Sequence, residues 1–124
     1  MNEKDIMEGF ILNNDYRLIE VSKGYCKMEA KITDKSLNPY KIVHGGFLFG
    51  MADTAAGIAA VTLNGKTVTV NATMDYFHFV KKGKIVAEAK CIKEGKTISV
   101  FEVSLYDENV NLVARSTITY ISIK

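Results

Sequence analysis

Residues His44–Ala60 read HGGFLFGMADTAAGIAA and predict a helix that is apolar on every side. Asp53 is the one formally charged residue between Val43 and Asn64. An isolated carboxylate is costly in an apolar interior, so it should be paired, hydrogen-bonded, neutralised or used in chemistry. A helix that is apolar all round must also be surrounded. We therefore expect a sheet on one side of this helix and a second subunit on the other.

The apolar run from Gly45 to Leu63 approaches the length of about 20 residues that spans a bilayer. Asp53 lies near its centre, where a carboxylate costs roughly 2.5–3.5 kcal/mol on insertion scales. Gly, Ala and Thr dominate the run, so we interpret it as a core helix and expect no membrane partner. The first ten residues, MNEKDIMEGF, lack the apolar core of a secretory signal, and we expect a cytoplasmic protein.

The composition predicts one domain over residues 1–124, with a net charge of +2 and 24% charged residues. No basic stripe alternates with aromatic residues, so nucleic acid is not an expected partner. Cys26 and Cys91 lie far apart, with no CxxC motif and no histidine cluster. They are typical of two reduced thiols in a cytosolic protein. No metal-ligand spacing is present, and we expect no metal and no cofactor.

The segments on both sides of the helix alternate apolar and polar residues, as strands do. A short amphipathic helix is predicted for Lys4–Leu12. The predicted strands are Tyr16–Val21, Tyr25–Thr33, Thr67–Val80, Ile85–Lys93, Thr97–Tyr106 and Leu112–Ile123. Their short connections favour an antiparallel meander. The predicted fold class is α+β, with one long central helix wrapped by a five- to six-stranded antiparallel sheet, an arrangement known as the hotdog fold.

One constellation resembles the PaaI-type acyl-CoA thioesterases of the hotdog superfamily. It consists of Asn38, His44-Gly45-Gly46 after five residues, Asp53 nine residues after the histidine, and Thr69 in the next strand. The resemblance extends from about Tyr16 to the C-terminus. It implies hydrolysis of an acyl- or aryl-CoA thioester to the free acid and coenzyme A. Coenzyme A is thus part of the substrate and is not a cofactor. It also implies a homodimer, assembled further as a dimer of dimers.

The resemblance implies a role for each residue of this constellation. Asp53 matches the carboxylate that acts as nucleophile or as general base on water, and the Gly45 N–H matches the oxyanion donor. Asn38 resembles the residue that positions the attacking water or the thioester. His44 matches a residue that supports the loop, and Thr69 falls where the family has a Ser or Thr near the carboxylate.

Gly46 and four lysines are the candidates for substrate binding. Lys81, Lys82, Lys84 and Lys96 could contact the phosphates of coenzyme A, or they could be solvated turn residues. His78-Phe79 stands where many relatives carry Arg-Pro, which leaves the acyl group open. Structural alternatives also remain for Asn38, as a turn residue before Pro39, and for His44, as a cap of the loop.

The position of Thr69 conflicts with simple strand alternation. In a regular strand Thr69 shares a face with Asn71 and Thr73, opposite the apolar Val68 and Val70. The apolar face is expected to pack on the core, which would turn Thr69 away from Asp53. Contact between the two requires either a site at the edge of the core or a bulge in the strand.

Gly45 and Asp53 are separated by eight residues, or about 12 Å along one helix. Attack and oxyanion stabilisation need groups around a single carbon, with reacting atoms about 3–3.5 Å apart. One helix cannot provide both. Two helices that lie antiparallel across a twofold axis can bring Gly45 of one subunit to Asp53 of the other. We therefore expect the active site at a dimer interface.

Two other functions are compatible with the predicted fold. A non-catalytic acyl-CoA sensor is one alternative, although only about fifteen residues precede the first predicted strand, too few for an appended DNA-binding helix pair. A hotdog dehydratase or hydratase is the other, but neither of the motifs that pair a histidine with an acid in those enzymes is present.

Overall fold

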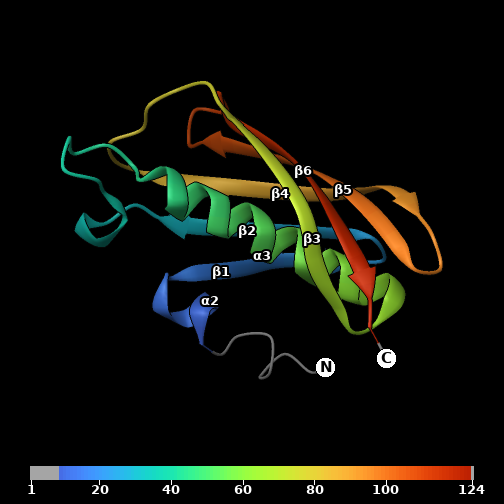
Figure 1. Cartoon of the computed structure of the whole chain (residues 1–124). Helices are drawn as coiled ribbons and strands as arrows, with labels where there is room; N and C mark the ends of the chain where they lie inside the picture. The colour runs from blue at the N-terminus through green and yellow to red at the C-terminus, as the bar shows by residue number, and fades with distance from the viewer. Residues whose placement is uncertain (1–8, 124) are drawn as a thin grey trace.

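The helix α3 (Gly45–Asn64) lies in the concavity of a six-stranded antiparallel sheet (Figure 1). The computed structural model describes residues 9–123 of the chain. By length and composition α3 could cross a membrane, but half of its most apolar segment is buried inside the protein. The sheet curves around it, as the sequence predicts for a core helix. The predicted hotdog architecture is therefore confirmed.

The strands are close to their predicted positions. They are β1 (Tyr16–Ser22), β2 (Tyr25–Lys31), β3 (Thr67–Tyr76), β4 (Lys84–Glu94), β5 (Ile98–Asp107) and β6 (Leu112–Ser122). A short 3-10 helix, η1 (Asp34–Ser36), lies between β2 and α3. The predicted helix Lys4–Leu12 falls mostly outside the described residues, within which α2 covers Phe10–Asn13.

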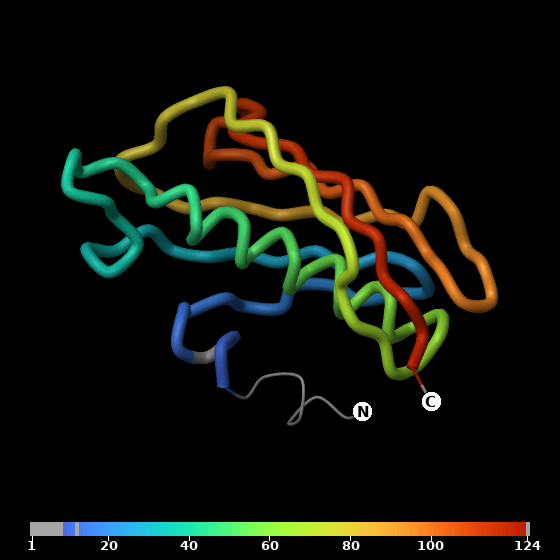
Figure 2. The backbone as a smooth tube through the Cα atoms, in the orientation of Figure 1, coloured from blue at the N-terminus to red at the C-terminus, as the bar shows by residue number. Residues whose placement is uncertain are grey.

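The order of the strands corrects the predicted meander. The sheet runs β1-β2-β4-β5-β6-β3, so β3 lies beside β6 at one edge and not beside β4. The predicted strand Thr67–Val80 is also too long, because β3 ends at Tyr76. Residues 77–83 form the connection that carries the chain across the end of the sheet to β4 (Figure 2). This connection is fixed by hydrogen bonds from the N–H groups of Phe77 and His78 to the carbonyl of Val113.

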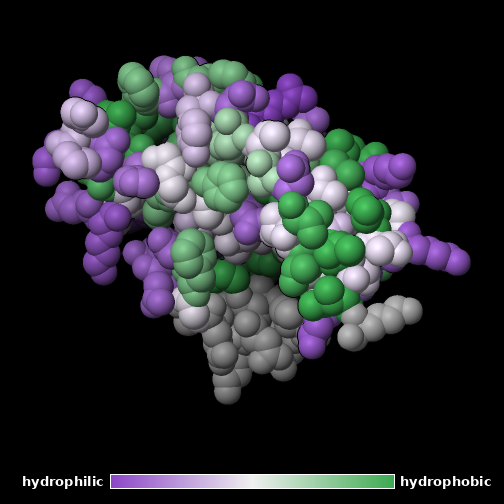
Figure 3. Space-filling model, viewed as in Figure 1, coloured by the Kyte–Doolittle hydropathy of each residue, from purple (hydrophilic) through white to green (hydrophobic). Residues whose placement is uncertain are grey.

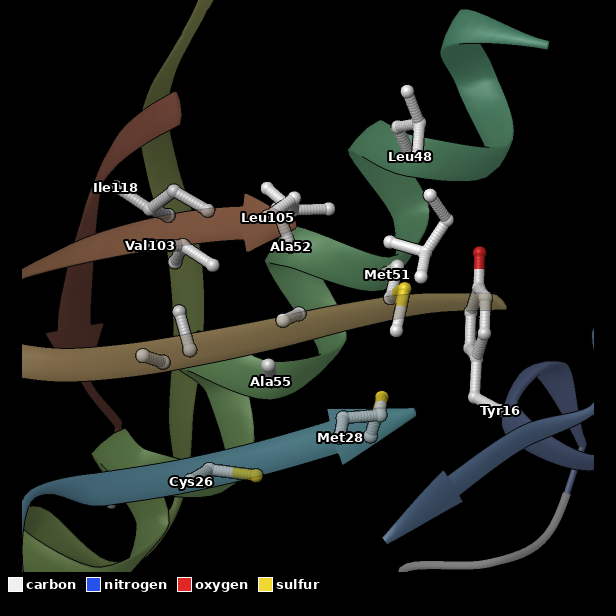
Figure 4. Close-up of a cluster of buried hydrophobic side chains, with 14 of the residues drawn as sticks. Tyr16, Cys26, Met28, Leu48, Met51, Ala52, Ala55, Val103, Leu105 and Ile118 are labelled. Carbon is white, nitrogen blue, oxygen red and sulfur yellow. The ribbon is translucent and has the colours of Figure 1, made fainter. Parts of the chain in front are cut away.

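The core lies between the inner face of the sheet and the buried side of α3. The helix contributes mainly small side chains, so the sheet approaches it closely, whereas the strands contribute larger ones (Figure 4). The largest of the fully buried side chains are Phe101, Met28, Met51, Ile85 and Leu105. Close packing of this kind fixes α3 firmly against the sheet. The positions of side chains on α3 relative to β3 and β6 are therefore well defined.

Candidate active site

The start of α3 leaves one backbone donor free. His44 is the N-cap residue, and its Nδ1 accepts a hydrogen bond from the Gly46 N–H at 2.7 Å. The N–H groups of Phe47 and Leu48 donate to the His44 carbonyl. Among the described residues, no group accepts a hydrogen bond from the Gly45 N–H. A free N–H at a helix start carries partial positive charge and can bind an anionic oxygen.

The two glycines and the histidine at the start of α3 have different roles. The Gly45 N–H is available, as the predicted oxyanion donor must be. The Gly46 N–H is occupied by the cap and cannot contact substrate while that cap is in place. A Cβ at Gly46 would lie 2.9 Å from the His44 imidazole, so the cap itself requires a glycine there. His44 thus takes the structural position that the sequence offered as an alternative.

The loop that leads into α3 is organised by Asn38. Its Oδ1 accepts hydrogen bonds from the N–H groups of Tyr40 at 2.9 Å and Ile42 at 3.3 Å. Its carbonyl accepts from the Lys41 N–H. The side-chain oxygen of Asn38 is thus used by the turn, as the structural alternative predicts, and its amide NH₂ is the part that remains for water or substrate.

The Asp53 carboxylate is held by two hydroxyl groups. Thr69 Oγ1 on β3 and the Tyr120 hydroxyl on β6 both donate to Asp53 Oδ1 at 2.7 Å. The Tyr120 hydroxyl also lies 2.7 Å from the Asp53 carbonyl. No donor within residues 9–123 contacts Oδ2. The half-buried carboxylate is therefore anchored through one oxygen, which leaves the other available for chemistry.

Tyr120 is a site residue that the sequence analysis missed. Its side chain is 2% exposed and packs edge-on against Phe101. Burial and the neighbouring Asp53 charge raise the pKa of Tyr120 far above its usual range, so the phenol stays protonated and donates. Its position near the end of β6, opposite Thr69 in the sheet, is the only signal that could have identified it, and that signal needs the strand order.

A bulge in β3 explains how Thr69 reaches Asp53. Thr69 pairs with Tyr120 and Asn71 pairs with Thr119, so Val70 is an extra residue in the ladder. The extra residue shifts the alternation. Thr69 faces the helix before the bulge, and Ala72 and Met74 face it afterwards. The expectation from regular alternation, that Thr69 turns away from the core, is therefore wrong.

Tyr76, near the opposite end of β3, contacts the start of α3. Its hydroxyl donates to the Gly45 carbonyl at 2.9 Å. A Cβ at Gly45 would lie 3.3–3.5 Å from three atoms of the Tyr76 phenol. In this structure the absence of a side chain at Gly45 thus makes room for Tyr76.

The four candidate lysines do not come together within one chain. Lys81 and Lys82 lie in the connection beside the start of α3, where the Val43 N–H donates to the Val80 carbonyl. Lys84 forms an ion pair with Glu29 at 2.8 Å on the outer face of the sheet. Lys96 lies in the β4–β5 turn, at the other end of α3 (Figure 1). A single subunit therefore provides no common phosphate site for all four.

Gly45 and Asp53 belong to one continuous helix, so the separation of about 12 Å holds in the structure. Each chain therefore has a free N–H at Gly45, at the start of α3, and an anchored carboxylate at Asp53, about two helical turns further along. In the described part of the chain, no group of three His, Cys, Asp or Glu residues could hold a metal ion. The chemistry that these groups support is attack on a carbonyl carbon with stabilisation of the resulting oxyanion.

Comparison with known proteins identifies the family. A model described as the thioesterase superfamily matches residues 40–114, which include Gly45, Asp53 and Thr69. This chain belongs to the thioesterase superfamily. The predicted enzyme class, a thioester hydrolase, is confirmed at the level of this family.

Individual members of the superfamily resemble the chain over most of its length. A protein named as an esterase in Saccharolobus solfataricus is 31% identical and covers 82% of this chain and 69% of its own. The acyl-coenzyme A thioesterase PaaI of Escherichia coli is 26% identical over 78% of this chain and 70% of its own. A solved structure of a Streptococcus mutans protein bound to acetyl-CoA has a TM-score of 0.84 and 25% identity, and covers 87% of this chain and 88% of that one. The predicted PaaI-type resemblance is thereby confirmed.

The contact between Tyr120 and Asp53 leads to a first prediction for this thioesterase. In Tyr120→Phe the ring still packs on Phe101, but Asp53 Oδ1 keeps only the hydroxyl of Thr69. Hydrogen bonds to charged groups contribute about 1.5–3 kcal/mol, so we expect kcat to fall by about tenfold to a hundredfold. Steady-state kinetics with an acyl-CoA that the wild type hydrolyses would measure this change. An unchanged kcat in a folded variant would show that Tyr120 does not position the carboxylate.

Proposed function

We propose that the protein is a homodimeric acyl-CoA thioesterase whose sites are shared between subunits. In each site, Asp53 of one subunit activates water or attacks directly, and the Gly45 N–H of the other binds the oxyanion. The products are the free carboxylic acid and coenzyme A. A further assembly into a dimer of dimers stays a prediction.

The observation that carries this proposal is the pair of unused groups on α3. The Gly45 N–H has no acceptor and Asp53 Oδ2 has no donor among residues 9–123, yet the helix keeps them about 12 Å apart. A twofold axis across two antiparallel α3 helices removes this separation, because each free donor then meets the other subunit's carboxylate. Each dimer would contain two such sites.

Two surfaces support such a dimer. The open side of α3 carries Gly46, Asp53 and Gly57 at helical spacing, and the two glycines allow a second helix to come close. Beside it, β3 is an edge strand, and unpaired edges of this length are usually protected. Val68 and Val70 on β3 are 44% and 55% exposed. Strongly apolar side chains gather where the end of α3 meets the start of β3 (Figure 3).

The reaction follows from the charges that these groups supply. With Asp53 as general base, Oδ2 accepts a proton from water while the water oxygen attacks the thioester carbonyl. The carbonyl oxygen becomes negative and is stabilised by the Gly45 N–H at a helix start. The carbon–sulfur bond then breaks, and the coenzyme A thiolate leaves and accepts a proton. With Asp53 as nucleophile, an acyl-enzyme anhydride forms first and water hydrolyses it.

The relatives support coenzyme A as the thiol portion of the substrate. The Escherichia coli relative is named as an acyl-CoA thioesterase, and the Streptococcus mutans structure contains acetyl-CoA. In this chain Lys81 and Lys82, next to the start of α3, are the lysines best placed to meet phosphates. His78 and Phe79 lie in the same connection, so the acyl preference is open to direct measurement.

Subunit complementation tests the shared site directly. Asp53→Asn and Gly45→Pro homodimers should each be nearly inactive. After random mixing, half of the dimers are hybrids with one intact site out of two, so we expect about a quarter of the wild-type activity. Asp53→Asn mixed with Asp53→Ala is the matched control and should stay inactive. A mixture that shows no recovery despite confirmed exchange, or a wild type that is monomeric, would contradict the shared site.

The assay itself separates catalysis from binding. Release of coenzyme A from aryl-, short- and medium-chain thioesters can be followed with a thiol reagent. Burial raises the pKa of Cys26 to about 12 and also raises that of Cys91, so the protein's own thiols react slowly. Tight binding of an acyl-CoA without release of thiol would favour the sensor alternative. Consumption of an enoyl-CoA without thiol release would favour a hydratase.

A further inference from the structure

The Gly45 N–H belongs to the His44–Gly45 peptide, whose carbonyl accepts from the N–H groups of Phe47 and Leu48, but Gly45 has no side chain to hold the residue on its other side. Gly45 is the first residue of α3, where helices fray and a glycine has the widest backbone freedom. The His44 cap holds the Gly46 N–H, one peptide further on. An oxyanion donor must nevertheless be oriented before the substrate arrives, because its contribution depends on preorganisation.

Tyr76 holds the next peptide, Gly45–Gly46, from outside the helix. Its hydroxyl donates to the Gly45 carbonyl at 2.9 Å, and three atoms of its phenol lie 3.3–3.5 Å from the position of a Cβ at Gly45. The side chain is 50% exposed, so it lies at the surface where the second subunit is proposed to bind. Partial burial raises the pKa of Tyr76, which keeps the hydroxyl protonated as a donor.

Because of the bulge in β3, side chains of this one strand contact both the Asp53 carboxylate and the residue that carries the oxyanion donor, Gly45. Thr69 and Tyr76 are separated by seven residues, and an odd separation places two side chains on opposite faces of a regular strand. The extra residue Val70 reverses this, so both side chains face α3. Thr69 contacts Asp53, whereas Tyr76 contacts Gly45 two helical turns away.

From these contacts we infer that Tyr76 is a positioning residue that fixes the Gly45 backbone from its carbonyl side and thereby keeps the Gly45 N–H in place for oxyanion stabilisation. It acts through the Gly45 carbonyl and through van der Waals contact with the glycine. This inference rests on the proposed function, because it assigns Tyr76 to the oxyanion half of that site. It predicts that loss of one hydroxyl group, far from the carboxylate of the same chain, slows the chemical step.

Kinetics of Tyr76→Phe test the role of the hydroxyl. The ring and its packing remain, so we expect kcat to fall by about fivefold to twentyfold with KM changed less than about twofold. Tyr25→Phe is the matched control, because the Tyr25 hydroxyl also donates a hydrogen bond, to Glu88 on the sheet, but touches neither Gly45 nor Asp53. An equal effect of both variants, or a rise in KM alone, would overturn the inference.

A double-mutant cycle asks whether Tyr76 acts through Gly45. In Gly45→Pro the oxyanion donor is absent, so a residue that only orients this donor has little left to contribute. We expect Tyr76→Phe to lower kcat much less in the Gly45→Pro background than in the wild type. Full additivity of the two effects on kcat would mean that Tyr76 acts elsewhere.

The amide signal of Gly45 gives a readout that does not depend on turnover. With an unreactive thioether analogue of acetyl-CoA that keeps the carbonyl, the Gly45 amide proton should shift on binding in wild type and Tyr25→Phe, and shift less in Tyr76→Phe. If the wild type binds the analogue with this shift but releases no thiol from any thioester, catalysis fails while the positioning role stands. If the wild type hydrolyses thioesters but Tyr76→Phe matches it in kcat and in the amide shift, the positioning role alone fails.

Discussion

Asp53→Asn lowers kcat for thioester hydrolysis by at least about 100-fold, because the amide cannot accept the proton that a general base removes and cannot act as a nucleophile. The substitution keeps the size of the side chain. Its amide oxygen can still accept hydrogen bonds from Thr69 and Tyr120, as Asp53 Oδ1 does. The fold and the anchoring of the side chain should therefore persist, and the loss isolates the negative charge and basicity of Oδ2.

Coenzyme A release under saturating acyl-CoA measures this loss, and thermal unfolding confirms that the variant is folded. Asp34→Asn is the matched control, since Asp34 is an exposed residue of η1 with no contact to the site. We expect wild-type kcat from it. Activity of Asp53→Asn within about tenfold of wild type would remove Asp53 from the chemical step.

Gly45→Pro deletes the proposed oxyanion donor and leaves the rest of the helix start intact. Proline has no N–H, and it is well tolerated as the first residue of a helix. The preceding residue, His44, has φ −63° and ψ 134°, which a following proline permits. Loss of one oxyanion donor costs about 10²–10³ in kcat, and we expect an effect of that size.

Gly45→Ala provides the matched comparison. Both substitutions add a Cβ that crowds the Tyr76 phenol at 3.3 Å, but alanine keeps the N–H. We expect Gly45→Ala to retain much more activity than Gly45→Pro, and the ratio of the two kcat values reports the donor itself. Equal kcat values in two folded variants would show that crowding at Tyr76, and not loss of the N–H, explains the defect.

Most of the fold could be predicted because its signals are local. The alternation in β2, β4 and β5 and the uninterrupted apolar run of α3 each follow from neighbouring residues. The position of β3 could not be predicted in this way. Which edge of the sheet it joins depends on its pairing with β6, a strand from the far end of the chain. The short segment Lys81–Lys84 resembles a hairpin turn, although the chain there crosses between separate parts of the sheet.

The residues of the candidate site differ in the same way: those close together in the sequence could be predicted, and those brought together by the sheet could not. Asn38, His44, Gly45 and Asp53 lie close together in the sequence, so their spacing alone could indicate a site. Tyr120 lies 67 residues after Asp53 and reaches it only because β6 neighbours β3. Tyr76 could be placed against Gly45 only once the bulge in β3 was known. Contacts between distant segments were therefore the part that one sequence could not supply.

We expect the bulge at Val70 to tolerate substitution of this residue but not its deletion or an insertion beside it. Val70 is more than half exposed, so many side chains could replace it without disturbing either half of the site. Removing it would restore a regular strand and turn either Thr69 or Tyr76 away from α3. Evolution or design can thus vary the side chain at Val70 freely, but a one-residue insertion or deletion there would turn one of the two anchoring residues away from α3.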